Sequence, residues 1–261
     1  MRPAPPADIL PAADLQEAAR MGMIETVTAA FLDARQRKTR IDAATVPTPD
    51  YDAALEIQSR VQRRLGPVSG FKVGARPEGA PSMAPILSAQ TWQSGARVPV
   101  RDTMGIELEI GFEVIAAPNT VPDAAADPLR CFRPRIVLEL VDSRLSGAED
   151  DALLKLADMQ MNEGVILGPA LDDWDGSDFG TLDATLTCGD TVVVDGPVSV
   201  PGGSALGSLS LLCTHVGAHC GGLQVGQVVI TGSISGLSYF PGGTEVAGRI
   251  DGFGPISCHL G

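Results

Sequence analysis

The run from Ile106 to Ile115 constrains the fold more than any other segment, because its side chains alternate strictly between two kinds. This period of two is that of a β-strand and differs from the helical period of 3.6. One face of the expected strand is apolar, and the other carries Glu107, Glu109 and Glu113. Glu107 and Glu109 are two residues apart, so both carboxylates can reach one ion. A solvated polar face is the other explanation of the same pattern.

A second strand is expected over residues 135–141, where the run is almost continuously apolar. Glu139 interrupts it, and a buried carboxylate without a partner is costly or takes up a proton. Arg135 or Arg144 could neutralise it as a structural partner. Alternatively, Glu139 joins Glu107 and Glu109 around Mg²⁺ or Mn²⁺, because hard cations prefer oxygen ligands.

Lys72 is the candidate for proton transfer, because glycines and apolar residues flank it in Gly70-Phe71-Lys72-Val73-Gly74. In a dry pocket near a metal, the pKa of a lysine falls and the amine can exchange protons near neutral pH. The other interpretation is a strand residue whose amine reaches solvent or forms a salt bridge.

The rest of the chain predicts an α+β protein. Helical spacing appears at about 15–38 and again after Pro49-Asp50, where Gly66-Pro67 ends it. A hairpin is expected around Cys188-Gly189-Asp190, one more helix over 204–220, and strands near 228–231, 244–250 and 255–259. We therefore expect a small N-terminal helical region, residues 1–68, followed by a sheet-rich metal-binding domain, residues 69–261.

Charge and composition exclude several classes of protein. The 261 residues include 19 Lys and Arg against 32 Asp and Glu, a net charge of −13, which is unsuited to binding a nucleic-acid backbone. No apolar run approaches the roughly 20 residues that span a bilayer, and the start lacks the apolar stretch of a secretory signal. The five cysteines are scattered and odd in number, which predicts a reducing, cytoplasmic location.

Two further groups of polar residues are candidates for a zinc site and for a substrate-binding site. If residues 204–220 form one helix, Cys213 and Cys220 lie on one face and His215 and His219 on roughly the opposite face, which excludes a shared zinc ion and leaves the histidines solvated. Thr231 and Ser233 follow an apolar strand, where hydroxyl and N–H groups can hold a substrate carboxylate or form a turn.

Taken together, these segments resemble the fumarylacetoacetate hydrolase superfamily, in its branch of 2-keto-4-pentenoate hydratases and 4-oxalocrotonate decarboxylases. The resemblance extends from about residue 20 to the end. It rests on the Lys72 segment, Ile106-Glu107-Leu108-Glu109-Ile110, the stretch from Leu138 to Arg144, and the stretch from Gly226 to Ser233. It implies that Glu107, Glu109 and Glu139 bind Mg²⁺ or Mn²⁺ and that Lys72 transfers protons. It also implies a mixed β-roll preceded by helices, in a homo-oligomer.

Two segments depart from the pattern of the hydratases. Where they carry an Asp before Phe-Gly, this chain has Ser82-Met83-Ala84, and where they carry Asp-Asn-x-Ser it has residues 158–163, including Met161 and Asn162. Ser82 and Asn162 are therefore the candidates for substrate binding in these segments, beside Thr231 and Ser233.

The resulting hypothesis is a metal-dependent hydratase, a lyase of aromatic catabolism, that acts on a 2-hydroxydienoate or 2-keto acid through an enolate-like intermediate. The alternatives are decarboxylation of a 2-keto diacid, C–C hydrolysis of an acylpyruvate, or a non-catalytic partner subunit of the same fold. Hydrolysis ranks lower, because family hydrolases use an N-terminal histidine and all three histidines here come after residue 214.

Overall fold

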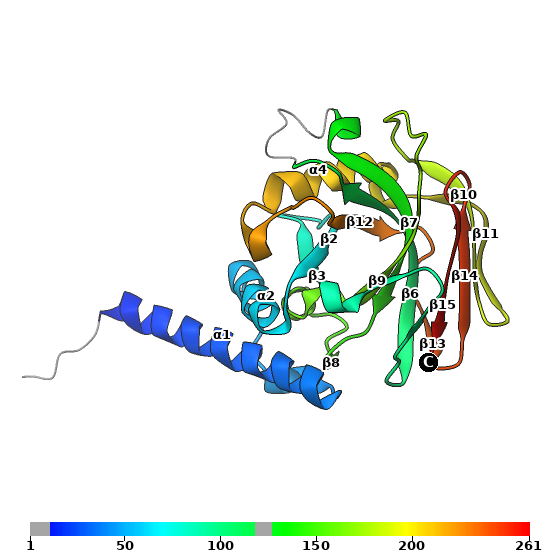
Figure 1. Ribbon diagram of the computed structural model, residues 1–261. Coiled ribbons are helices and arrows are strands. Elements are labelled where there is room, and N and C mark those ends of the chain that lie inside the picture. The colour runs from blue at the N-terminus through cyan, green and yellow to red at the C-terminus, as the bar shows by residue number, and fades with distance from the viewer. Residues whose placement is uncertain (1–10, 118–126) are drawn as a thin grey trace, which may run out of the picture.

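The computed structural model describes residues 11–117 and 127–261, and it confirms the α+β class. An N-terminal helical region precedes a strongly curled mixed sheet, against which a second sheet packs (Figure 1). The α-helices are α1 (Ala12–Arg37), α2 (Tyr51–Leu65), α3 (Ala152–Ala157) and α4 (Ala205–His215). Within the described ranges, no helix combines the length and apolar character needed to cross a bilayer.

The larger sheet has eight strands, in the order β3-β2-β12-β6-β7-β9-β4, with β13 paired to β6 beside this path. Their bounds are β2 (Val68–Gly74), β3 (Ser82–Leu87), β4 (Thr91–Gln93), β6 (Thr103–Val114), β7 (Phe132–Val141), β9 (Asn162–Ala170), β12 (Val228–Ser233) and β13 (Ser238–Pro241). The pairs β2–β12 and β4–β9 are parallel and the others antiparallel, so the sheet is mixed.

The second sheet has five strands, in the order β11-β10-β14-β15-β5. They are β5 (Ala96–Val98), β10 (Thr181–Cys188), β11 (Thr191–Ser199), β14 (Glu245–Ile250) and β15 (Gly254–Leu260). The predicted hairpin is confirmed as the antiparallel pair β10–β11. A short parallel pair joins β1 (Ile41–Asp42) to β8 (Leu145–Ser146).

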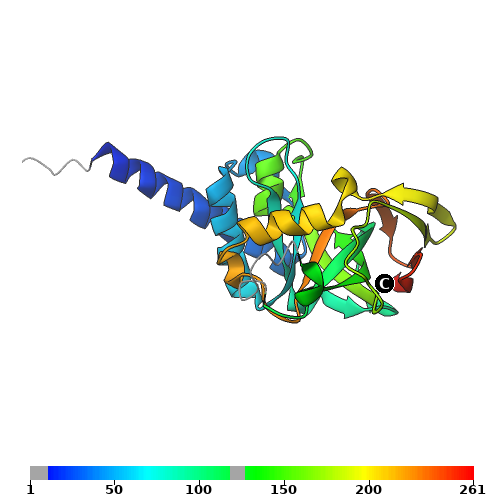
Figure 2. The same cartoon turned by 90° about the horizontal axis from the view of Figure 1, so that it is seen from above.

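Alternation along β6 and β7 divides the large sheet into two faces. The apolar face of β6, from Ile106 to Val114, is fully buried in the main core against the second sheet and α4. Figure 2 shows α4 lying across this part of the molecule. The opposite face lines the inside of the curl. It carries the glutamates above a small apolar floor that includes Val137, Val165 and Ile230.

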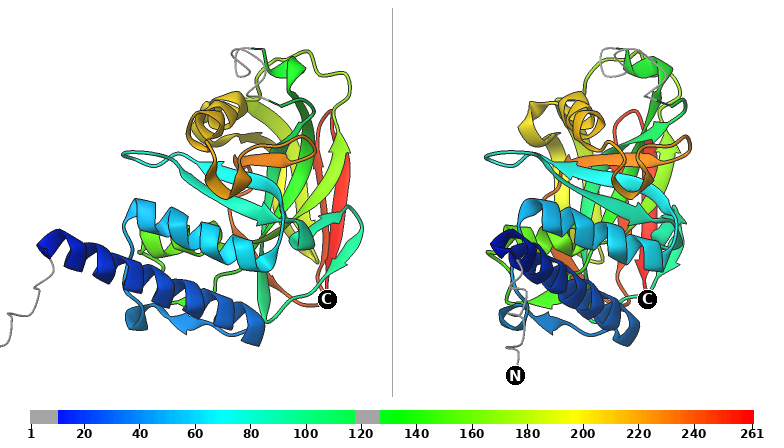
Figure 3. Two further views of the ribbon diagram at one scale, coloured as in Figure 1. Left: turned by 60° about the vertical axis from the view of Figure 1, so that its left-hand side comes forward. Right: turned by 90° about the vertical axis from the view of Figure 1, so that its left-hand side faces the viewer.

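A separate apolar cluster joins the helices. Ile24, Phe31 and Ile57 are buried between α1, α2 and α3. The two long helices lie side by side, and the N-terminal part of α1 extends away from the body (Figure 3). Asp50 caps α2 as expected, since its carboxylate accepts a hydrogen bond from the N–H of Ala53 at 2.7 Å.

The prediction of one helix over 204–220 is wrong at its C-terminal end. Helix α4 stops at His215, because Gly217 takes a left-handed conformation with φ +47°. A short 3₁₀ turn, η7 (His219–Gly221), follows, and within it Cys220 also has positive φ. The helical geometry assumed for the histidines and cysteines therefore does not apply beyond residue 215.

Candidate metal centre and active site

The pairing of β6 with β7 brings the three glutamates together. Glu107 lies directly opposite Glu139 in the register, and Glu109 follows one step along the same face, opposite Val137. One carboxylate oxygen from each glutamate lies within 4.8 Å of the other two. Among residues 11–117 and 127–261, no other cluster of acidic, histidine or cysteine side chains has this geometry.

Lys72 reaches this cluster from β2, two strands away across β12. Its Nζ atom lies 2.6 Å from Glu139 Oε1 and 3.1 Å from the backbone oxygen of Gln160. Only 17% of the lysine side chain and 1% of the glutamate side chain are exposed. The structure therefore brings Lys72 and the three glutamates together at one interior point. Their roles in proton transfer and metal binding stay predictions.

The alternative explanation of Glu139, a structural pairing with Arg135 or Arg144, is not what the structure shows. Arg135 pairs with Glu113, and Arg144 is bound by Asp158 and Glu163. Arg135 lies beside Glu113 at the other end of the β6–β7 pair, and Arg144 follows the end of β7.

The partners of Glu139 are instead Lys72 and Asn162, whose amide nitrogen donates to the same Oε1 atom at 2.8 Å. The other oxygen, Oε2, is buried and has no hydrogen-bond partner among the described residues. A buried carboxylate oxygen without a hydrogen-bond partner, beside two further carboxylates, fits the donor set of a divalent-cation site.

Burial and mutual repulsion perturb the titration of the cluster. The pKa of Glu109 is raised well above its usual value by burial and by the charges of Glu139 and Glu107. Burial and Glu139 also raise the pKa of Glu107, against the effects of Lys72 and of a hydrogen bond from Ser233. Burial would lower the pKa of Lys72, but the three carboxylates outweigh it and the pKa is raised. The lowered pKa expected from the sequence applies to a lysine beside a bound metal ion, and it stays a prediction.

Strand β12 supplies polar contacts from the other side. The N–H of Gly232 donates to Glu109 Oε2 at 2.7 Å. Ser233 lies opposite Glu109 in the register, and its hydroxyl donates to Glu107. Thr231 is buried and donates to the backbone oxygen of Ile110 at 2.9 Å, so its hydroxyl is already used within the sheet.

The two candidate residues from the departing segments lie near Lys72. Asn162 contacts Glu139 directly, as described above. Ser82 pairs with Gly74 in the β2–β3 register, which puts it on the same face as Lys72, and its hydroxyl donates to the Gly74 carbonyl at 3.0 Å. No described contact joins Ser82 to the glutamates. Substrate binding by these residues stays a prediction.

A strained turn contributes a group that the sequence analysis missed. Met159, Gln160 and Met161 all have positive φ, between 51° and 60°, which costs roughly 1–3 kcal/mol each for residues other than glycine. This turn aims the carbonyl of Gln160 at Lys72. No feature of side-chain type marks such a turn in the sequence, because none of the three residues is Gly, Asn or Asp.

A cavity of about 300 Å³ adjoins this turn and is lined by Met161 and Tyr239, among others. Tyr239 lies on β13 opposite Gly105, one step along the same face of the sheet from Glu107. Burial and the nearby charges of Asp142 and Glu107 raise the pKa of this tyrosine. None of the three glutamates lines this cavity itself.

The cysteine and histidine segment lies in a separate cluster against α2. His219 Nε2 donates to Gln58 Oε1 at 2.9 Å, and Nδ1 faces the Ser59 hydroxyl at 3.3 Å. Burial lowers the pKa of His219 to about 4, so the expectation of a solvated histidine is wrong here. His215, at the end of α4, is exposed as expected.

No family model and no curated protein matches the chain. Solved structures do. Two structures of 4-oxalocrotonate decarboxylase from Pseudomonas putida G7, one complexed with calcium and acetate and one with magnesium and adipate, align with TM-scores of 0.75 and 0.74. Each alignment covers 92% of this chain and 98% of that chain, at 19% and 20% identity. This chain has the fold of 4-oxalocrotonate decarboxylase.

Isomerases and hydrolases align less completely. A 5-carboxymethyl-2-hydroxymuconate delta-isomerase from Mycobacterium smegmatis covers 74% of this chain and 80% of its own length, with a TM-score of 0.53 and 16% identity. A fumarylpyruvate hydrolase from Burkholderia cenocepacia, named as putative, covers 76% and 89%, with a TM-score of 0.53 and 15% identity. The fold implied by the sequence resemblance is confirmed.

Proposed function

We propose that this protein is a divalent-metal-dependent enzyme of the fumarylacetoacetate hydrolase superfamily that acts on a 2-keto acid or its 2-hydroxydienoate form. One observation carries the proposal. Three glutamates converge within 4.8 Å around an orphaned carboxylate oxygen, with Lys72 in contact with one of them. Structural ion pairing does not explain this arrangement, because a single lysine faces three carboxylates.

The residues fit a hard divalent cation. The cluster offers oxygen ligands alone, and its formal charge with Lys72 included is −2, which such a cation would neutralise. The decarboxylase of the same fold is complexed with calcium or magnesium, which supports Mg²⁺ here. Mn²⁺ prefers similar ligands and stays a prediction.

A cation held by Glu107, Glu109 and Glu139 would act as a Lewis acid towards the carboxylate and C2 oxygen of the substrate and would stabilise charge that develops there. The protein itself supplies the rest. Lys72 holds a proton at Nζ, oriented by Glu139 and the Gln160 carbonyl, and would exchange it with a substrate carbon. The apolar floor below the cluster, which includes Val137 and Ile230, excludes water from that side.

Among the candidate reactions, decarboxylation of a 2-keto diacid needs the fewest groups from the protein. The bond to the departing carboxyl breaks, its electron pair moves through the conjugated chain towards the ketone oxygen, CO₂ leaves, and Lys72 returns one proton to carbon. The decarboxylase matches 92% of the chain, whereas the isomerases and hydrolases described above match about three quarters, which favours this outcome.

Hydration is the second candidate, because Ser82 shares the face of Lys72 and could position water. It needs the Ser82 hydroxyl to leave the Gly74 carbonyl, to which it donates at present.

The test uses the full-length protein with a panel of 2-keto diacids and 2-hydroxydienoates, followed by mass spectrometry. We expect loss of CO₂ with Mg²⁺, no turnover after treatment with a chelator, and recovery when Mg²⁺ is restored. Gain of water would assign hydration instead. Turnover that persists in metal-free protein refutes the metal-dependent scheme, and substrate binding without any product identifies a non-catalytic subunit.

Glu107→Gln provides the variant for this test, and Glu113→Gln is its matched control. Both residues lie on the same face of β6, but Glu113 pairs with Arg133 and Arg135 outside the cluster. We expect turnover and Mg²⁺ binding to be lost only in Glu107→Gln. Equal loss in both variants would show that the strand, and not the metal site, had been disturbed.

A further inference from the structure

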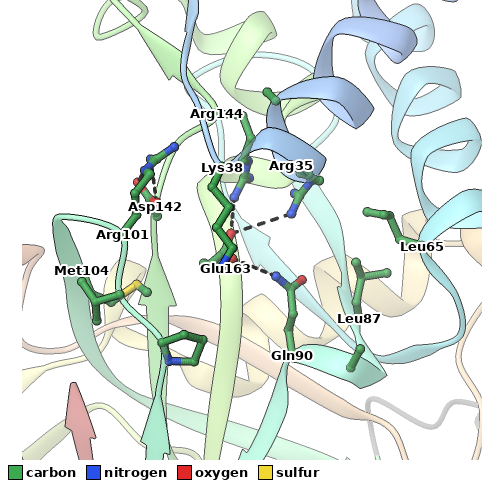
Figure 4. A pocket seen from close by; sticks show the side chains of 14 residues that line it. Arg35, Lys38, Leu65, Leu87, Gln90, Arg101, Met104, Asp142, Arg144 and Glu163 are labelled. Atoms are coloured by element: carbon green, nitrogen blue, oxygen red, sulfur yellow. Dashed lines mark hydrogen bonds and ion pairs between the residues drawn. The ribbon is translucent and has the colours of Figure 1, made fainter. Parts of the chain in front are cut away.

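A second cavity, of about 340 Å³, lies where the C-terminal end of α1 meets the large sheet. It does not include any of the three glutamates of the metal centre. Figure 4 shows Arg35, Lys38 and Arg144 around Glu163, and Arg101 apart from them beside Asp142. The ionisable residues that line it are four cations and two acids: Arg35, Lys38, Arg101, Arg144, Asp142 and Glu163. The cavity thus has an excess of two positive charges in a chain whose net charge is −13.

Both acids of this cavity already have close partners. Glu163 accepts from Arg144 at 2.7 Å and from the Gln90 amide at 3.0 Å. Asp142 is held by Arg101 at 2.7 Å and by Arg40 at 2.9 Å. Both carboxylates are therefore bound by other residues, and neither is a close partner of Arg35 or Lys38.

Arg35 is unusual in this cavity, because its guanidinium is largely buried and incompletely paired. Only 10% of its side chain is exposed, and its one ion pair within the described ranges is a 3.7 Å approach to Glu163, too long for a hydrogen bond. Its Nε atom is buried without a hydrogen-bond partner. Burial and the charge of Arg144 lower the pKa of Arg35 to about 10. A buried guanidinium whose Nε atom lacks an acceptor is unfavourable, and a bound anion would relieve this condition.

Lys38 adds a second uncommitted cation. It ends α1 in a left-handed conformation with φ 55°, and its amine has no ion-pair partner among residues 11–117 and 127–261. Its side chain runs beside Arg144 towards Glu163 (Figure 4). The remaining wall is apolar and includes Leu65, Leu87 and Met104.

We propose that this cavity binds a small organic anion, a monocarboxylate with an apolar body. The carboxylate contacts Arg35 and Lys38, and the hydrocarbon body packs against Leu65, Leu87 and Met104. The volume lies at the small end of ligand pockets, which suits a molecule of about the size of benzoate. The apolar wall favours such a carboxylate over inorganic phosphate, which has no apolar part to bury.

The test is calorimetric titration of the full-length protein with benzoate, and with benzamide as a neutral probe of the same shape. The variant is Arg35→Met, which keeps an unbranched apolar stem and removes the charged guanidinium. Arg37→Met is the matched control, because Arg37 is exposed on the same helix turn and pairs with Asp33. The titrations are repeated with a chelator and in Glu139→Gln.

We expect one benzoate per chain and no binding of benzamide. Affinity should fall at least about tenfold in Arg35→Met, because a charge-assisted hydrogen bond is lost. It should be unchanged in Arg37→Met, in Glu139→Gln and with the chelator. In urea denaturation without ligand, Arg35→Met should be at least as stable as the wild type, since it removes an unsatisfied buried charge.

Several results would overturn the proposal. These are the absence of benzoate binding at millimolar concentration, equal binding of benzamide, or unchanged affinity in Arg35→Met. Benzoate affinity that disappears in Glu139→Gln would place the anion at the metal centre instead. Clear destabilisation of ligand-free Arg35→Met would make the contact with Glu163 a structural ion pair.

Discussion

Replacing Glu109 by Gln should stabilise the metal-free protein while removing its response to Mg²⁺. Glu109 is 1% exposed and lies among two other carboxylates. Two like charges 4.8 Å apart repel by about 3 kcal/mol at an effective dielectric constant of 20. Attraction to Lys72 and partial protonation offset part of this, so we expect a gain of about 1–3 kcal/mol in the free energy of unfolding.

The amide of the variant keeps the structural contact of the carboxylate, because its oxygen can still accept from the N–H of Gly232. With Mg²⁺ at 100 times its dissociation constant, the wild type gains about 2.7 kcal/mol. If losing one ligand weakens binding about 100-fold, the same concentration stabilises Glu109→Gln by only about 0.4 kcal/mol.

Urea denaturation in chelator and in Mg²⁺ measures both effects. Glu113→Gln is the control, because this acid lies on the same face of β6 but pairs with Arg133 at 3.0 Å and Arg135 at 3.3 Å. The control should lose no more than about 1 kcal/mol and keep its response to Mg²⁺. If Glu109→Gln is less stable than the wild type in chelator and gains as much from Mg²⁺, the three carboxylates do not form a cation site.

Three further predictions follow from other features of the structure. Lys72→Met should lower kcat at least about 100-fold while Mg²⁺ still binds in calorimetry, because only the proton carrier is lost; equal loss of Mg²⁺ binding would contradict this role. The pKa of His219 is lowered to about 4 from 6.5, so the unfolded chain takes up the proton first. The contribution of neutral His219 to the free energy of unfolding is complete above pH 6.5. About 3 kcal/mol of it is lost as the pH falls to 4. Denaturation at several pH values should show a smaller loss of stability on acidification in His219→Gln than in the wild type. His215→Gln should lose as much stability as the wild type. Gly70→Ala should cost about 3 kcal/mol, because a Cβ atom there would lie 2.0 Å from the backbone oxygen of Val228; an unchanged melting temperature would refute the close approach of these strands.

The sequence predicts the strands that carry the acids because their side-chain period is unambiguous. Ile106 and its alternate neighbours on β6 are fully buried, and Glu107 and Glu109 share the other face, as expected. That Lys72 joins them came from the family resemblance, since no local pattern states that β12 separates β2 from β6.

Other features depend on contacts between distant residues or on backbone conformation. Glu139 is paired with Lys72 and not with the arginines near it in sequence, because neighbours along the chain do not identify neighbours across a curled sheet. The left-handed turn around Gln160 has no compositional signal. The end of α4 does have such a signal, Gly217, whose left-handed conformation ends the helix.

Three sequence-based expectations stay predictions. These are the division of the chain between residues 68 and 69, assembly as a homo-oligomer, and a cytoplasmic location.

The direct pairing of Glu107 with Glu139 has a consequence for how such a site changes over time. Moving β6 by one residue relative to β7 would turn Glu107 and Glu109 towards the main core and bring Ile106 and Leu108 to the face that carries Glu139. A slip of this kind would disrupt the hydrophobic core as well as the ion site. The packing of the core and the geometry of the ion site are therefore preserved together. A descendant of this chain can lose metal binding through substitution of a glutamate, but not through a shift in the register of the two strands.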